Sequence, residues 1–173
     1  MGIVRLNHAV LYVADLQRSL DFYCGVLGFR RIEEMTPAGF KGAGFLRAPG
    51  STNDHDLGLF EIGGGAAPSQ AGRSTTGLYH LAWEVDNLDE LDRLAGALTE
   101  AGALVGASDH GTTKSLYAKD PDGIELEIVW LIPADLLTEV ALEARTSIGR
   151  LDLAAEKAKF GATTRGGVGI SVV

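Results

Sequence analysis

Two histidines at equivalent positions of a repeated segment are the residues of this sequence best suited to bind a metal ion. Residues 6–13 read LNHAVLYV and residues 78–85 read LYHLAWEV, so an offset of 72 residues places His80 over His8. Neutral imidazole is the commonest metal ligand among protein side chains. An isolated histidine is more often structural, but a repeat that carries one in each copy favours a shared role in metal binding.

A carboxylate from a later strand is expected to complete this site. Residues 124–128 read IELEI, in which Glu125 and Glu127 alternate with apolar residues as on the polar face of a β-strand. Two imidazoles and one carboxylate leave open coordination positions on one side of the metal, as in non-haem Fe(II) oxygenases. We therefore predict one Fe(II), with Mn(II) as the alternative. Because Cys24 is the single cysteine, we expect neither a thiolate cluster nor an internal disulfide.

The repeat also predicts the elements that position these ligands. In each copy the histidine segment precedes a helical pattern that ends at Gly28 or Gly102, and β-type segments follow. The last strands also align, since residues 56–62 match residues 122–128 at an offset of 66, which makes Glu61 the counterpart of Glu127. We predict an α+β fold of two paired βαβββ modules forming a cupped mixed sheet around the metal, with module 1 at about residues 3–62 and module 2 at about 77–132.

Two further segments lie outside the predicted modules. Residues 63–72, GGGAAPSQAG, contain too few large apolar groups to pack and are predicted to be a flexible linker. From Pro133 the apolar spacing becomes helical, which predicts a C-terminal helical extension over residues 133–173. We expect the Gly-rich stretch at 163–170 to be disordered or to pair with a neighbouring chain.

The overall composition restricts the partners. The 173 residues are 46% hydrophobic and 22% charged, which is typical of one globular domain. A net charge of -8 argues against nucleic acid, because binding to phosphates requires clustered basic residues. No apolar run approaches the roughly 20 residues that span a bilayer. We therefore expect a cytoplasmic protein that binds neither nucleic acid nor membrane, and that forms a homo-oligomer, either a dimer or a tetramer.

The sequence resembles the vicinal-oxygen-chelate superfamily, which includes glyoxalase I, fosfomycin-resistance enzymes and type I extradiol dioxygenases. The resemblance implies one such domain over residues 3–132. In that superfamily the carboxylate ligand follows the glycine of an Asp-Pro-x-Gly turn by four residues, which implies Glu127 after Gly123. Glu125 has the same strand parity and stays as an alternative. The resembling segments are LNH at 6–8, LDFY at 20–23, VLGF at 26–29, YHLA at 79–82 and DPDG at 120–123.

Three further residues resemble catalytic groups of single-domain extradiol dioxygenases. His55 lies in NDHDLGLF, which is similar to a His-Asp-x-Ala-Leu segment whose histidine acts as an acid-base group beside the O2 site. His110 and Tyr117 resemble groups that hydrogen-bond the ring oxygen of the substrate. The resemblance implies an Fe(II)-dependent extradiol dioxygenase that inserts O2 into an aromatic diol and yields a hydroxymuconic semialdehyde. An amino-acid catechol such as L-DOPA is one candidate substrate.

Two other functions are left open by the sequence. A glyoxalase I-like isomerase or lyase would use a fourth protein ligand, for which Glu61 is the candidate. Such an enzyme has no need of His55 and His110, which argues against it. A metal-free resistance protein that binds a small molecule would keep the fold without the ligands, and the intact set of three predicted ligands argues against that function.

Overall fold

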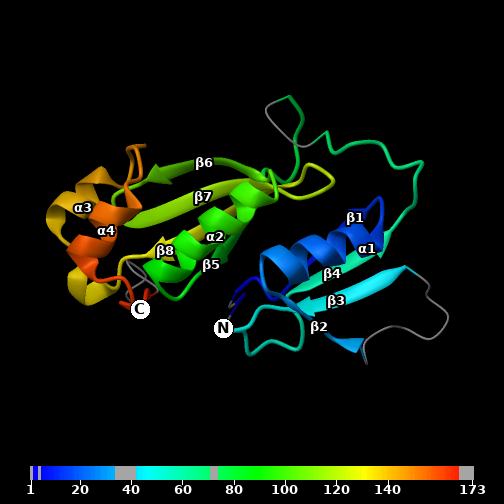
Figure 1. Cartoon of the computed structure of the whole chain (residues 1–173), viewed down its shortest axis with the longest axis horizontal. Coiled ribbons are helices and arrows are strands. Elements are labelled where there is room, and N and C mark those ends of the chain that lie inside the picture. Colours follow the sequence, from blue (N-terminus) through cyan, green and yellow to red (C-terminus); the bar gives the residue numbers. More distant parts are fainter. Residues whose placement is uncertain (1, 4, 34–41, 71–73, 168–173) are drawn as a thin grey trace. The chain divides into compact units, whose positions relative to one another are not determined.

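The computed structural model describes residues 2–3, 5–33, 42–70 and 74–167, and within them the chain forms two four-stranded mixed sheets (Figure 1). The chain divides into two compact units. Unit 1 comprises Met1–Ser69 and Pro121–Gly123, and unit 2 comprises Gln70–Asp120 and Ile124–Val173. Each sheet carries a helix between its first and second strand, so the predicted α+β fold with a repeated strand-helix-strands module is confirmed.

Unit 1 holds the first module. Its sheet has the order β1-β4-β3-β2, in which β1 runs parallel to β4 and the other neighbours are antiparallel. Strand β1 is therefore an edge strand. The elements in chain order are β1 (Ala9–Val13), α1 (Leu16–Leu20), the π-helical turn η1 (Asp21–Val26), β2 (Arg30–Arg31), β3 (Ala43–Arg47) and β4 (Leu57–Glu61).

Side chains of β1 alternate between the two faces of the sheet of unit 1. Leu11 and Val13 are buried, whereas Val10 and Tyr12 are exposed. Because side chains alternate along a strand, the position of His8, two residues before Val10, belongs to the exposed face. His8, the first predicted metal ligand, therefore belongs to the exposed face of this sheet and not to its core.

Helix α1 packs on the buried face of the sheet of unit 1. Its first residue is set by a side-chain cap, and a glycine in the sheet allows close contact. The Asp15 side chain accepts a hydrogen bond from Arg18 N at 2.9 Å, which caps the helix. Gly44 allows the helix to approach the sheet, since a Cβ atom there would lie 3.2 Å from Leu16 Cδ1. The helical segment ends at Gly28, whose φ of 82° is the left-handed conformation expected of a glycine C-cap.

Unit 2 holds the second module and the C-terminal extension. Its sheet has the order β5-β8-β7-β6, with β5 parallel to β8 and the other neighbours antiparallel. The elements are β5 (His80–Glu84), α2 (Leu88–Glu100), β6 (Leu104–Asp109), β7 (Thr113–Lys119), β8 (Glu125–Leu131), the 3-10 turn η3 (Ala134–Leu136), α3 (Glu139–Ala144) and α4 (Leu153–Phe160).

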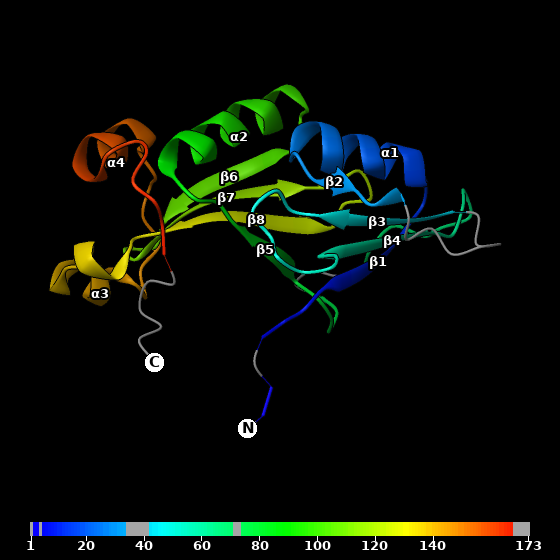
Figure 2. The same ribbon diagram turned by 90° about the horizontal axis from the view of Figure 1, so that it is seen from below.

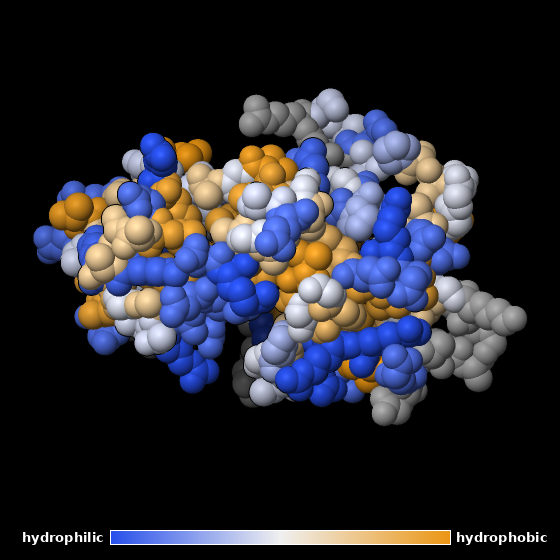
Figure 3. Space-filling view, viewed as in Figure 1, coloured by the Kyte–Doolittle hydropathy of each residue, from blue (hydrophilic) through white to orange (hydrophobic). Residues whose placement is uncertain are grey.

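Helix α2 covers one face of the sheet of unit 2 (Figure 2). Asn87 caps its start by accepting a hydrogen bond from Glu90 N at 2.8 Å. Its outward side is mostly hydrophilic near that start (Figure 3), as expected of an amphipathic helix. The core of unit 2 forms between α2 and β8. Helix α2 contributes Leu88, Leu91, Leu94 and Leu98, and β8 contributes the apolar residues that alternate with its glutamates, Leu126, Ile128 and Trp130.

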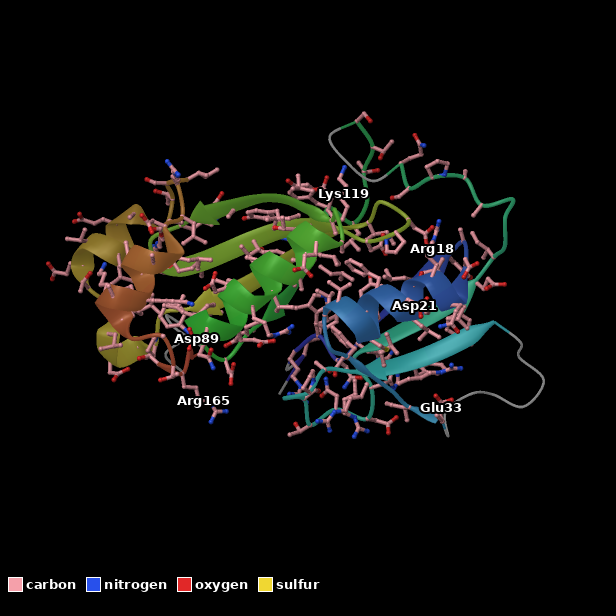
Figure 4. The ribbon with its side chains drawn as sticks, viewed as in Figure 1. Arg18, Asp21, Glu33, Asp89, Lys119 and Arg165 are labelled. Atoms are coloured by element: carbon pink, nitrogen blue, oxygen red, sulfur yellow. The ribbon has the colours of Figure 1, made fainter. Side chains whose placement is uncertain are left out.

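The predicted C-terminal extension is helical, as α3 and α4 show. Phe160 of α4 packs against Trp130, with the two rings tilted and their centroids 5.6 Å apart. Lys157 binds Asp89 at 2.9 Å and Asp92 at 2.5 Å, and Figure 4 shows Asp89 at the start of α2 beside α4. Residues 163–167 of the Gly-rich stretch were expected to be disordered or to pair with a neighbouring chain, but they bind unit 2 itself, where Gly166 N donates to Asp86 O at 2.6 Å. Residues 168–170 of that stretch and residues 71–72 of the linker lie outside the described residues. None of the helices in the described ranges is long and apolar enough to cross a membrane.

Candidate functional site

The sheet face of unit 2 opposite α2 carries most of the polar residues that were predicted to be functional. Pairing of β5 with β8 places His80 beside Glu125 and Ala82 beside Glu127, and pairing of β7 with β8 places Tyr117 beside Glu127. Residues paired in this way share one face of a sheet. The residues between them, such as Leu126, point into the core. Strand alternation therefore gathers the polar groups on one surface.

His80 and Glu127 are in direct contact in unit 2. His80 Nε2 lies 3.1 Å from Glu127 Oε2, and both side chains are largely buried. Two adjacent ligands of an octahedral ion, each bound at about 2.1 Å, would lie about 3.0 Å apart, so this spacing fits a shared metal ion. His80 Nδ1 is buried and has no hydrogen-bond partner among the described residues. A buried ring nitrogen of that kind is typical of a site completed by water or a ligand.

Glu125, the alternative carboxylate, makes a different contact. Its Oε1 atom lies 3.7 Å from Lys119 Nζ, and both side chains are partly exposed. Such an exposed ion pair contributes little, whereas Glu127 is in contact with the other predicted ligand of unit 2, His80, at 3.1 Å. Glu127 is therefore the better candidate ligand of the two.

Tyr117 links Glu127 to His110. Its hydroxyl oxygen lies 2.8 Å from His110 Nε2 and 3.3 Å from Glu127 Oε1. Burial and the nearby Glu127 carboxylate raise the pKa of Tyr117 to about 12. The phenol therefore keeps its proton at neutral pH. Unit 2 thus brings together four of the six predicted site residues, in the order His80, Glu127, Tyr117 and His110.

The other two predicted residues, His8 and His55, lie together in unit 1. Their ring centroids are 4.5 Å apart, and the ring of His55 also packs edge-on against Phe45 at 5.2 Å. His8 Nδ1 lies 2.8 Å from Asn7 Oδ1. An amide oxygen only accepts, so this contact places the His8 proton on Nδ1 and leaves Nε2 free to bind a metal.

A polar loop that the sequence analysis did not identify fixes the surroundings of these two histidines. The buried Asp56 carboxylate accepts hydrogen bonds from Ala48 N at 2.8 Å, Ser51 Oγ at 2.7 Å and Asn53 Nδ2 at 2.7 Å. Asn53 Nδ2 also donates to Asn7 O at 2.9 Å. The loop that carries His55 is therefore tied to the residue before His8. A Ser-x-Asn spacing is typical of a turn, but it gives no sign of a contact with Asn7, which lies 46 residues away in the sequence.

The predicted equivalence of Glu61 and Glu127 is wrong. Val10 and Ala82 each follow a repeat histidine by two residues, and their partners are Gly58 and Glu127 respectively. Gly58 is therefore the residue of unit 1 equivalent to Glu127. The register of β4 is set by its buried leucines, which must face α1. The repeat alignment had instead matched the acidic residues, which placed Glu61 opposite Glu127, three residues away from the true equivalent, Gly58.

Glu61 has a structural role instead. It pairs with Val13 on the helix-covered face, and its Oε2 atom accepts a hydrogen bond from Leu16 N at 2.8 Å. This carboxylate satisfies a free N–H group at the start of α1 and interacts favourably with the positive end of the helix.

Replacement of Glu61 is expected to affect stability and not metal binding. Glu61→Ala should lower the free energy of unfolding by about 0.5–1 kcal/mol, because α1 loses a partner for its N-terminus. Urea denaturation monitored by circular dichroism measures this loss, and metal analysis of the same sample measures ion content. Glu100→Ala at the end of α2 is the matched control and should change neither. Loss of the bound ion in Glu61→Ala would show that Glu61 is a ligand after all.

The described residues of each unit contain no complete metal-binding group. Within each, no three His, Cys, Asp or Glu residues of the described part form such a group. His80 and Glu127 lie in unit 2 and His8 lies in unit 1. The complete three-ligand site therefore stays a prediction, of which unit 2 holds two members in contact.

Comparison with known proteins agrees with this architecture. The family model for the Glyoxalase/Bleomycin resistance protein/Dioxygenase superfamily matches residues 5–128. Among solved structures, a glyoxalase/dioxygenase from Nostoc punctiforme superposes with a TM-score of 0.60 at 26% identity, covering 72% of this chain and 89% of that one. A glyoxylase/bleomycin resistance protein/dioxygenase domain from Frankia sp. EAN1pec superposes with a TM-score of 0.61 at 25% identity, covering 74% of this chain and 92% of that one.

Two curated relatives carry different activities in their names. Catechol-2,3-dioxygenase of Bacillus subtilis is 33% identical over 129 residues, which are 71% of this chain but 40% of the dioxygenase. Lactoylglutathione lyase of Escherichia coli O157:H7 is 31% identical over 131 residues, which are 73% of this chain and 92% of the lyase. The identities are close to equal, so the choice between these chemistries depends on the residues of the site.

Proposed function

Because the chain belongs to the Glyoxalase/Bleomycin resistance protein/Dioxygenase superfamily, we propose that it is an extradiol dioxygenase that uses Fe(II) and O2 to cleave the ring of a catechol-type substrate. Superfamily members include metal-dependent enzymes that act on small molecules. The single observation that carries the choice of reaction is Gly58, which occupies the position of unit 1 equivalent to Glu127.

The number of protein ligands decides between the two chemistries. With no side chain at Gly58, the proposed ligands are His8, His80 and Glu127. Three protein ligands in an octahedral shell leave three positions, which accommodate both oxygens of a catechol and O2. A fourth protein ligand would leave two, which is too few for that combination. The set of two imidazoles and one carboxylate suits Fe(II), with Mn(II) as the alternative.

The remaining residues of the site would orient the substrate and move protons. Bound iron would supply the electron transfer between ring and O2 that ring cleavage requires. The Tyr117 hydroxyl and the His110 ring, which are in contact with each other and adjacent to Glu127, suit hydrogen bonding to a ring oxygen of the substrate. His55, beside the ring of His8, suits proton transfer near the O2 position. The product would be a hydroxymuconic semialdehyde.

Oxygen uptake with catechols tests the proposed reaction directly. The Fe(II)-loaded chain, mixed under air with a panel of simple and substituted catechols that includes L-DOPA, should consume O2 and form an intense yellow product. The colour is expected because extradiol cleavage leaves a long conjugated enolate. An oxygen electrode and visible absorbance measure the two changes, and boiled protein is the control. Absence of O2 uptake across the panel with a fully loaded chain would exclude the proposal.

A glyoxalase-type reaction is the second candidate. It is favoured by the lactoylglutathione lyase relative, because this chain aligns with 92% of that enzyme. Gly58 argues against it, since a four-ligand site would need a carboxylate there. Incubation of the Ni(II)- or Zn(II)-loaded chain with the hemithioacetal of methylglyoxal and glutathione tests this reaction, which should be undetectable. A metal-free resistance function is disfavoured by the contact of His80 with Glu127.

We further propose that residues 3–132 act as one vicinal-oxygen-chelate domain, followed by the extension at 133–173. The protein is proposed to be cytoplasmic and to form a homo-oligomer, a dimer or a tetramer, with O2 and a small aromatic diol as its partners. Light scattering after size-exclusion chromatography measures the oligomeric state.

A further inference from the structure

The C-terminal extension contacts the turn that carries His110. This turn, residues 109–114, connects β6 to β7, and the family model ends at residue 128, before the extension begins. Asp109 and Gly149 exchange two backbone hydrogen bonds, of 3.0 Å and 2.8 Å. The segment after α3 therefore adds an antiparallel bridge to the end of β6.

Helix α3 packs closely against the same turn. Gly111 has a φ of 75°, and a Cβ atom there would lie 2.5 Å from Ala141 O and 2.8 Å from Ala144 Cβ. A glycine is therefore required both by the backbone conformation and by the close approach of α3. The residue after His110 is thus fixed by the extension.

Helix α4 holds the other side of the turn through a buried lysine. Lys114 is only 2% exposed, and its Nζ atom lies 2.5 Å from Asp109 Oδ1 and 3.2 Å from Glu156 Oε2. A buried ammonium group needs partners of this kind, because an unpaired charge inside a protein is costly. Glu156 therefore joins α4 to Lys114 at one end of the turn that contains His110, and Lys114 in turn binds Asp109 at the other end.

Each nitrogen of the His110 ring makes one contact, and the two contacts together orient the ring. Its Nδ1 atom lies 3.3 Å from Ser147 O in the extension, and its Nε2 atom lies 2.8 Å from the Tyr117 hydroxyl. In a neutral imidazole one nitrogen donates and the other accepts, and a carbonyl oxygen can only accept. The contact with Ser147 therefore requires a proton on Nδ1, and in a neutral ring this leaves Nε2 as the acceptor for Tyr117.

We propose that the C-terminal extension is a positioning element for His110, in which the Ser147 carbonyl fixes the tautomer and α3 and α4 hold the turn. The functional importance of His110 rests on the proposed dioxygenase activity, whereas the positioning itself does not. In that tautomer the single hydrogen of the Tyr117 hydroxyl is donated to His110 Nε2 at 2.8 Å, in competition with Glu127 Oε1, to which the same hydroxyl can donate at 3.3 Å.

Nitrogen-15 NMR of the full chain tests the tautomer without any assay of activity. Zn(II) is added in place of Fe(II), because a paramagnetic ion would broaden the signals. In the native chain His110 is expected to carry a proton on Nδ1, where it faces Ser147 O. Glu156→Gln and, as a second variant, Gly111→Ala should convert His110 to a mixture of tautomers. Glu143→Gln removes the same charge from an exposed part of α3 and should leave the signals unchanged. A native His110 without a proton on Nδ1 would overturn the proposal.

Turnover separates positioning from a purely structural role. Glu156→Gln should lower kcat for catechol cleavage by about 10-fold while metal content stays the same, as is typical when a residue that orients a catalytic group is lost. A lower melting temperature with unchanged kcat and unchanged tautomer would show that the extension only stabilises unit 2. If no catechol is cleaved, the proposed function fails, but the NMR result still decides whether the extension positions His110.

Discussion

Replacement of His80 by alanine is expected to reduce the Fe(II) content of the purified chain from about one ion per chain to background. His80 Nε2 and Glu127 Oε2 lie 3.1 Å apart, at the spacing of two neighbouring ligands. Removal of one of three protein ligands leaves too few donors to compete with water, since loss of even a residue that supports a ligand typically costs about 10–100-fold in metal affinity. Plasma emission spectroscopy after desalting measures the ion content.

Two matched controls make this result specific. His110→Ala removes another imidazole from the same face of unit 2 and should keep the ion. Glu127→Gln should lose the ion and Glu125→Gln should keep it. This comparison distinguishes the two carboxylates, which lie on the same face of β8. Full retention of iron by His80→Ala would refute the assignment of the metal site.

His8→Ala tests the contribution of unit 1 separately. If the three-ligand site is correct, this variant loses its ion as His80→Ala does, although His8 lies in the other unit. If His80→Ala loses the metal ion but His8→Ala retains it, unit 2 binds the metal without a ligand from the first repeat.

The repeat in the sequence was sufficient to predict the fold, because β-alternation and helix ends are local properties. Val10 and Leu11 differ in burial as their positions in the strand require, and Gly28 and Gly102 adopt positive φ at the ends of their helical segments. Asn87 begins α2 as a side-chain cap. Each of these features depends on neighbours within a few residues, which a single sequence contains.

Strand register and long-range contacts could not be predicted in the same way. The alignment of Glu61 with Glu127 failed because β4 is positioned by buried leucines and not by its acidic residue. The contact of His110 with Ser147 spans 37 residues and uses a backbone carbonyl, which has no signature in the sequence. The π-helical form of Asp21–Val26 was also not predicted, because its apolar spacing matches that of an α-helix.

Replacement of His55 is expected to separate proton transfer from metal binding. If His55 acts as a general acid or base, His55→Ala should slow catechol cleavage by about 100-fold or more while the ion is retained, because such groups contribute 10²–10⁴-fold and do not hold the metal. The ring of His55 also packs against Phe45 and lies beside His8, so loss of the ring alone would disturb the site. His55→Phe restores an aromatic ring of similar size without the nitrogens, and it should be as slow as His55→Ala. Steady-state O2 uptake and metal analysis on both variants measure the two properties. Recovery of more than about half of the native kcat by His55→Phe would show that the site needs a ring at this position and not a proton donor.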